Sequence, residues 1–266
     1  MSVSRNGQHP RSARNGRGKI RPGAAFYDLD GTLVDLNLVH AALFMQTNLG
    51  EWSGRIGYVL SFLARAPRLY LAERDDRRVL NAVLFESLKG VSEDRLFSLG
   101  EEYCERVLVK HLYPQAIQLL DANHTHGLRP VLVTGSPDFI VAPLARHLGI
   151  EDYAANHLTT VGGRATGRIA EPVMAGEAKA IWCEQFASEH NLDLAASWGY
   201  ADSYYDMPFL AALGHPVAVN PDRRLRTAAV SRHWPIIHFD TPEAFDSAGH
   251  EFADPATDGR PAHGAT

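Results

Sequence analysis

The feature that most constrains this chain is a short apolar run that ends abruptly in two acids, within residues 24–35. Residues 24–27 have the composition of a buried strand, and Asp28 and Asp30 follow with one residue between them. Gly31 gives the backbone the freedom to turn directly after the acids. Ligands of open α/β sheets bind outside the carboxyl ends of the strands, so we expect both carboxylates at that edge of a sheet.

Asp28 and Asp30 have two possible explanations. Carboxylates this close repel each other unless a cation or a shared proton lies between them. Oxygen ligands favour a hard cation, and Mg²⁺ commonly takes one or two carboxylates and leaves its other positions to water and phosphate. The structural alternative is an Asp that caps a following helix. A lone pair of acids does not decide between these two explanations, so motifs further along the chain are needed.

The composition is that of an ordinary globular protein. The chain has 266 residues, of which 45% are hydrophobic and 21% charged, and its formal net charge of −5 does not favour nucleic acid as a partner. Residues 1–23 are basic, contain no acid and lack the apolar segment of a secretory signal, so we expect a disordered tail of unassigned role. A second disordered tail is expected at 246–266. The isolated Cys104 and Cys183 are typical of core residues in a reducing compartment, which favours a cytoplasmic protein.

Residues 36–112 show helical spacing of apolar side chains without a strand-like run. One helix suffices to connect neighbouring parallel strands, so a longer insert is expected to form a small helical cap domain after the first strand. Residues 24–35 and 113–245 would form the core, an α/β fold with a Rossmann-like doubly wound parallel sheet. The apolar residues 56–71 are best explained as a packed cap helix, and the alternative is a lip that contacts a membrane surface or a lipid substrate without spanning the bilayer.

A second strand-like run occupies residues 131–137 and contains small polar residues near its end, Thr134, Gly135 and Ser136. Residues 156–169 then predict a β-hairpin, because Gly162 and Gly163 suit its turn.

Charged residues mark two later places in the chain. Lys179 lies near the start of a predicted helix, where its charge opposes the helix dipole and would gain from a nearby anion. A strand ending near Tyr200, followed by a helix, would place Asp202 and Asp206 four residues apart and facing the same way. Further strand-like runs follow at 216–220 and 236–239.

These four markers resemble the motifs of the haloacid dehalogenase superfamily of phosphohydrolases, whose order is DxDGT, a strand ending in Ser or Thr, a Lys, and an acidic GDSxxD-type box. The helical insert and the hairpin are similar to those of its phosphoserine-phosphatase-like branch, subfamily IB. The similarity covers residues 24–240. It implies a phosphatase that acts on a small-molecule phosphate ester, with Mg²⁺ as cofactor and a phosphoaspartate intermediate.

The resemblance also implies a role for each matching residue. Asp28 would be the nucleophile, and Asp30 would serve as general acid and then general base. The carboxylates of Asp28 and Asp202, with the backbone carbonyl of Asp30, would hold Mg²⁺. The phosphoryl group would be bound by Thr134, Gly135, Ser136 and Lys179.

Asp206 and Ser203 would support that site. Asp206 could bind the metal through water or hold Lys179, and the spacing does not choose between these roles. Two other functions stay open: a phosphotransferase or mutase with the same aspartyl-phosphate chemistry, and a non-catalytic phosphate-binding protein. The substrate could be phosphoserine, a sugar phosphate, a head-group phosphate or a lipid phosphate. The oligomeric state has no signal in the sequence.

Overall fold

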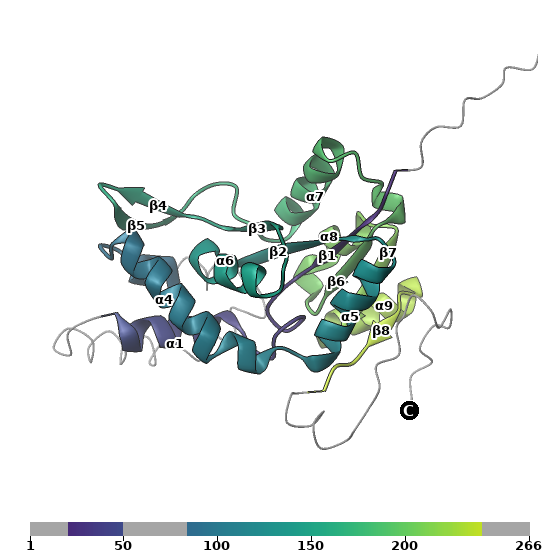
Figure 1. Cartoon of the computed structure of the whole chain (residues 1–266). Coiled ribbons are helices and arrows are strands. Elements are labelled where there is room, and N and C mark those ends of the chain that lie inside the picture. Colours follow the sequence, from purple (N-terminus) through teal and green to yellow (C-terminus); the bar gives the residue numbers. More distant parts are fainter. Residues whose placement is uncertain (1–20, 50–83, 241–266) are drawn as a thin grey trace, which may run out of the picture.

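The computed structural model describes residues 21–49 and 84–240 (Figure 1). Within these ranges six parallel strands form one sheet in the order β3-β2-β1-β6-β7-β8. The strands are β1 (Ala24–Tyr27), β2 (Arg129–Pro137), β3 (Asp152–Asn156), β6 (Trp198–Ala201), β7 (His215–Val219) and β8 (Ile236–Ile237). The order reverses at β1, as it does in doubly wound sheets, so the predicted fold class is confirmed.

Helices cover both faces of this sheet. Successive side chains of a strand point to opposite faces, so Ala25 and Tyr27 pack on one side and Ala24 and Phe26 on the other. The first side is covered by α5 (Pro114–Thr125) and α6 (Asp138–His147), and the second by α7 (Glu177–Glu189), α8 (Met207–Ala211) and α9 (Arg223–Arg232). The central strand is therefore buried on both faces.

Further helices lie beyond α6, on the side away from α7 (Figure 1). They are α1 (Leu38–Asn48), α4 (Glu93–Arg106) and the short 3₁₀-helix η1 (Leu108–His111). The Phe44 and Tyr103 rings join α1 to α4, with centroids 5.0 Å apart. Gly100 allows α4 to approach α6, because a Cβ there would overlap the carbonyl oxygen of Phe139. The apolar residues 56–71 of the predicted insert lie outside the described residues.

The predicted hairpin is present as the antiparallel strands β4 (Leu158–Val161) and β5 (Arg164–Ile169). It reaches the start of α4 (Figure 1). The N–H of Glu93 donates to the carbonyl of Gly163 at 3.0 Å, and that of Ala165 donates to the carbonyl of Val91 at 2.8 Å. The hairpin thus connects the sheet to the segment that leads into α4.

Several details differ from the sequence prediction. β3 was not predicted, because Asp, Ala and Asn are poor strand formers; its place follows from pairing with β2. The helix expected after Asp202 begins as a 3₁₀ turn, η3 (Tyr204–Asp206), before α8. Residues 21–23, assigned above to the tail, are described, and the N–H of Asp193 donates to the carbonyl of Pro22 at 2.9 Å. A short 3₁₀-helix, η2 (Leu194–Ala196), follows Asp193. Among the described residues, no helix has the length and apolar character needed to cross a membrane.

Candidate active site

Asp28 stands at the carboxyl end of the central strand. It follows β1 directly and is 1% exposed. Its N–H donates to the carbonyl of Tyr200 in β6 at 2.9 Å, so main-chain pairing between the two strands continues to this residue. β1 and β6 are parallel neighbours, and Asp202 comes directly after β6. The sheet therefore brings these two acids, 174 positions apart in the sequence, to the same edge.

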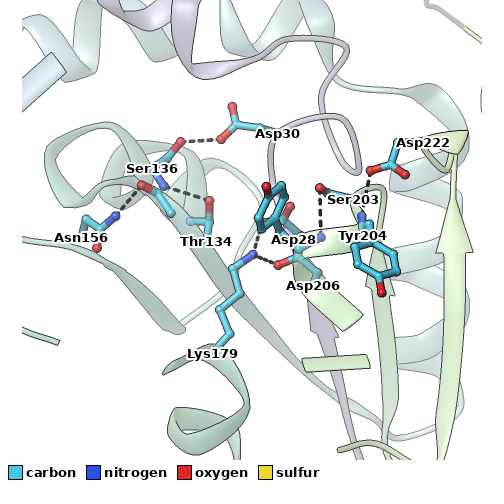
Figure 2. Close-up of polar contacts among 12 residues, drawn as sticks. Asp28, Asp30, Thr134, Ser136, Asn156, Lys179, Ser203, Tyr204, Asp206 and Asp222 are labelled. Carbon is cyan, nitrogen blue, oxygen red and sulfur yellow. Dashed lines mark hydrogen bonds and ion pairs between the residues drawn. The ribbon is translucent and has the colours of Figure 1, made fainter. Parts of the chain in front are cut away.

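Lys179 reaches this edge from the first turn of α7 (Figure 2). Its Nζ donates to Oδ1 of Asp28 at 2.8 Å and lies 2.7 Å from Oδ1 of Asp206. The lysine is 2% exposed, and burial of an ammonium is tolerated when carboxylates pair with it. The sequence analysis expected Lys179 to gain from a nearby anion, and Asp28 and Asp206 are the anions that contact it. The contact with Asp206 matches one of the two roles that the sequence left open for that residue.

Three carboxylates lie close together at this edge of the sheet, and two of them contact Lys179. Oxygen atoms of Asp28, Asp202 and Asp206 all lie within 4.8 Å of one another. Three acids against one ammonium leave an excess of negative charge, which a cation would relieve. The donors are all oxygen, so the set fits a hard divalent ion such as Mg²⁺.

Gly31 allows the first and fourth motifs to approach each other. Its φ of +78° lies in the left-handed region that glycine adopts without strain. A Cβ at this position would lie 2.5 Å from Oδ2 of Asp202, inside any normal contact. The DxDGT turn therefore packs against the carboxylate of the acidic box with no room for a side chain.

The polar residues of β2 are linked to Asp30 (Figure 2). Thr134 is fully buried, and its Oγ1 accepts a hydrogen bond from the N–H of Ser136 at 3.1 Å. The Ser136 hydroxyl donates to Oδ2 of Asp30 at 2.5 Å. The carbonyl of Gly135 accepts from the side chain of Asn156 at 2.7 Å. The second motif thus contacts the first motif on one side and the end of β3 on the other.

Two residues of this region were not predicted from the sequence as parts of the site. Asn156 was predicted as the first residue of the hairpin, whereas it ends β3, the strand that was missed, and no local signal pointed to a role in the site. Asp222 accepts from the N–H of Tyr204 at 2.8 Å and from that of Leu225 at 2.7 Å, so it caps α9 and holds η3 at once. Its capping role was readable from its place before a helical run. Ser203, which was predicted, accepts from the N–H of Tyr205 at 3.4 Å and caps η3.

Two buried tyrosines lie near acids of the first motif and its segment, Tyr103 near Asp30 and Tyr113 near Asp35. Burial raises the pKa of Tyr103 on α4, and the charge of Asp30 raises it further. Burial also raises the pKa of Tyr113, whose hydroxyl donates to Oδ1 of Asp35 at 3.1 Å. Both phenols are therefore neutral at physiological pH and can act as hydrogen-bond donors.

Comparisons with known proteins agree on one family. The model of the haloacid dehalogenase-like hydrolases matches residues 25–211. A phosphoserine phosphatase of Mycobacterium tuberculosis is 30% identical over 220 residues, which cover 81% of this chain and 70% of the relative. A protein of unknown function from Bordetella pertussis has a solved structure with a TM-score of 0.69 at 28% identity, covering 82% of this chain and 98% of that one. A phospho-aspartyl intermediate analogue of phosphoserine phosphatase shares the fold, with a TM-score of 0.60 at 17% identity, covering 87% and 100% of the chains.

Proposed function

The chain belongs to the haloacid dehalogenase-like hydrolase family, on its phosphoserine-phosphatase-like branch, and we propose that it is a Mg²⁺-dependent phosphomonoester phosphatase working through a phosphoaspartate. One observation carries the proposal: Lys179 is buried between Asp28 and Asp206, at the sheet edge where Asp202 adds a third carboxylate. Phosphoryl transfer depends mainly on positioning and charge compensation, and this arrangement supplies both.

Asp28 is the proposed nucleophile. A carboxylate needs no base to attack phosphorus, because it is ionised at neutral pH. A bond forms between a carboxylate oxygen of Asp28 and phosphorus while the bond from phosphorus to the ester oxygen breaks. In its protonated form Asp30 would give its proton to that leaving oxygen, and the carboxylate so formed would later take a proton from the water that hydrolyses the phosphoaspartate and releases Asp28. The hydrogen bond from Ser136 supports this role, since it orients the Asp30 carboxyl group.

Charge on the phosphoryl group is compensated from two sides. Lys179 and the β2 residues Thr134, Gly135 and Ser136 would bind the phosphoryl oxygens, as the resemblance implies. The carboxylates of Asp28 and Asp202, with the carbonyl of Asp30, would hold Mg²⁺. The ion would offset the negative charge of the acids and of the phosphate. Asp206 would hold Lys179, which its 2.7 Å contact supports.

The domain division and the location of the protein are parts of the same proposal. Residues 36–112 would form the cap and residues 24–35 with 113–245 the core; limited proteolysis that cut first inside β1 or β2 would count against this division.

A cytoplasmic location is supported by the two buried free thiols, Cys104 and Cys183. Export of a tagged chain to an oxidising compartment would contradict it.

The first test is hydrolysis of a chromogenic phosphate ester by the full chain, with Mg²⁺ and with EDTA. We expect activity in Mg²⁺ and none in EDTA. In Asp28→Asn the rate of hydrolysis should fall about 10³-fold or more, because an amide is not a nucleophile here. Asp35→Asn is the matched control, an acid of the same segment that contacts Tyr113 instead of Lys179. Full activity in Asp28→Asn would refute the proposal.

The substrate is proposed as a small phosphate monoester, with phosphoserine as the first candidate because of the Mycobacterium tuberculosis relative. Measuring kcat/KM for phosphoserine, a sugar phosphate, phosphocholine and a lysophospholipid phosphate would rank these substrates. Preference for the acylated ester would favour the lipid alternative of the sequence analysis. Transfer of phosphate to an added alcohol in place of water would indicate a phosphotransferase.

A further inference from the structure

Asn156 is a buried amide at the end of β3 whose two polar atoms both bind backbone. It is 1% exposed. Its Nδ2 donates to the carbonyl of Gly135 at 2.7 Å, and its Oδ1 accepts from the N–H of Met174 at 2.7 Å. A buried amide with a strong partner at each end is fixed in its orientation.

The contact with Gly135 controls a whole peptide group. The carbonyl of Gly135 and the N–H of Ser136 belong to one planar unit, so a bond that holds the carbonyl also fixes the direction of that N–H. The N–H of Ser136 donates to the hydroxyl of Thr134, which places that hydroxyl as well. Asn156 thus holds the middle of the Thr134 segment, the β2 residues 134–136 that contribute the second motif (Figure 2).

The contact with Met174 reaches toward a different motif. Met174 lies five residues before Lys179, in the segment that leads to Gly176 at the start of α7. Asn156 and Met174 stand on either side of the β4–β5 hairpin, and the N–H of Ala170 donates to the carbonyl of His157 across its base at 2.8 Å. One side chain therefore connects the Thr134 segment of β2 with the residues that lead into α7, the helix of Lys179.

We propose that Asn156 is a positioning residue, which fixes the Thr134 segment of β2 relative to the helix of Lys179 so that both can face one phosphoryl group. The inference rests on the proposed function of those two motifs. The positioning role requires the amide group of Asn156 itself. Aspartate has the same shape but lacks the donor for the Gly135 carbonyl, and its charge would repel that oxygen.

The test compares Asn156→Asp with Asn123→Asp. Asn123 is the matched control, because it is also 1% exposed and also donates from its amide, at 2.6 Å to the Tyr27 hydroxyl and at 3.0 Å to that of Tyr200. In Asn156→Asp we expect kcat to fall about 10- to 100-fold and inhibition by orthovanadate to weaken by a similar factor, with KM within about threefold. In Asn123→Asp all three should stay within about threefold of the wild type, although Tm falls. A folded Asn156→Asp enzyme no more impaired than the control would overturn the inference.

Asn156→Ser provides a smaller, neutral substitution in case the aspartate prevents folding, with the same expected results. If neither variant folds, NMR of the wild type decides: orthovanadate should shift the side-chain amide resonances of Asn156 more than those of Asn123, and equal or absent shifts overturn the inference. If the wild type hydrolyses no phosphate ester, the proposed function has failed on its own. The rise in Tm produced by inorganic phosphate then tests Asn156, and an equal rise in the wild type and Asn156→Asp counts against it.

Discussion

Replacing Gly31 by alanine should separate backbone strain from damage to the site. The φ of +78° places alanine in the left-handed region, at a cost of about 1–2 kcal/mol. In addition, the new Cβ would lie 2.5 Å from Oδ2 of Asp202, whereas ordinary contact begins at 3.4 Å, so the two groups must separate by about 0.9 Å. A misplacement of about 1 Å at a catalytic site can cost about 10²-fold in rate.

Gly127→Ala is the matched control for this substitution. Gly127 has a φ of +76°, almost the same as Gly31, but a Cβ there would meet nothing within 4 Å. Both variants should therefore lose similar stability from the backbone, about 1–2 kcal/mol measured by urea unfolding. Only Gly31→Ala should also lose activity and need more Mg²⁺ for half-maximal rate.

The assay measures kcat/KM for a chromogenic ester across a Mg²⁺ titration, together with the rise in Tm that Mg²⁺ produces. We expect Gly31→Ala to lose about 10²-fold in kcat/KM and most of that rise. If Gly31→Ala keeps wild-type activity and the wild-type response to Mg²⁺, the Asp202 carboxylate is not part of the site.

Three further results are expected. Lys179→Met leaves the buried Asp28 and Asp206 without the ammonium that pairs with them. The rate of ester hydrolysis should fall about 10²- to 10³-fold, and the free energy of unfolding should fall by about 3–5 kcal/mol. An unchanged free energy of unfolding in urea would show that the ion pairs are not formed. Asp222→Ala removes the cap of α9 and should cost about 1–2 kcal/mol, and no loss in urea unfolding would exclude that role. Burial raises the pKa of Cys104 to about 11 from 9.0, so the stability that this buried neutral thiol contributes is complete below pH 9 and is lost as pH rises toward 11. Thiol reagents at pH 8 should therefore label Cys104 only after the protein unfolds.

The parts of the site that could be predicted lie on short local segments. An apolar run followed at once by Asp28 is readable because strand composition, turn glycine and acids are adjacent in the sequence. Local signals also marked Thr134 near the end of its strand and Lys179 at the start of its helix. Asp28 could thus be assigned to an edge of the sheet before any long-range contact was known, whereas the resemblance to the family was needed to place Lys179 in the same site.

The parts that could not be predicted depend on contacts between distant segments. β3 exists because it pairs with β2, which outweighs its weak strand composition. Asn156 is recognised only when its partners Gly135 and Met174 are known. The role of Asp206 stayed open in the sequence because two contacts were compatible with its spacing, and the ion pair with Lys179 is a tertiary fact.

The most direct test of the account is to find the phosphate on the enzyme. Asp30→Asn should slow hydrolysis of the intermediate, because no base takes the proton of the attacking water. After mixing this variant with a phosphate ester and quenching in acid, mass spectrometry should find phosphorylation on Asp28, and Asp28→Asn should abolish it. If the wild type releases phosphate but Asp30→Asn shows no phosphorylated Asp28 after mixing with the same ester, the central claim is contradicted.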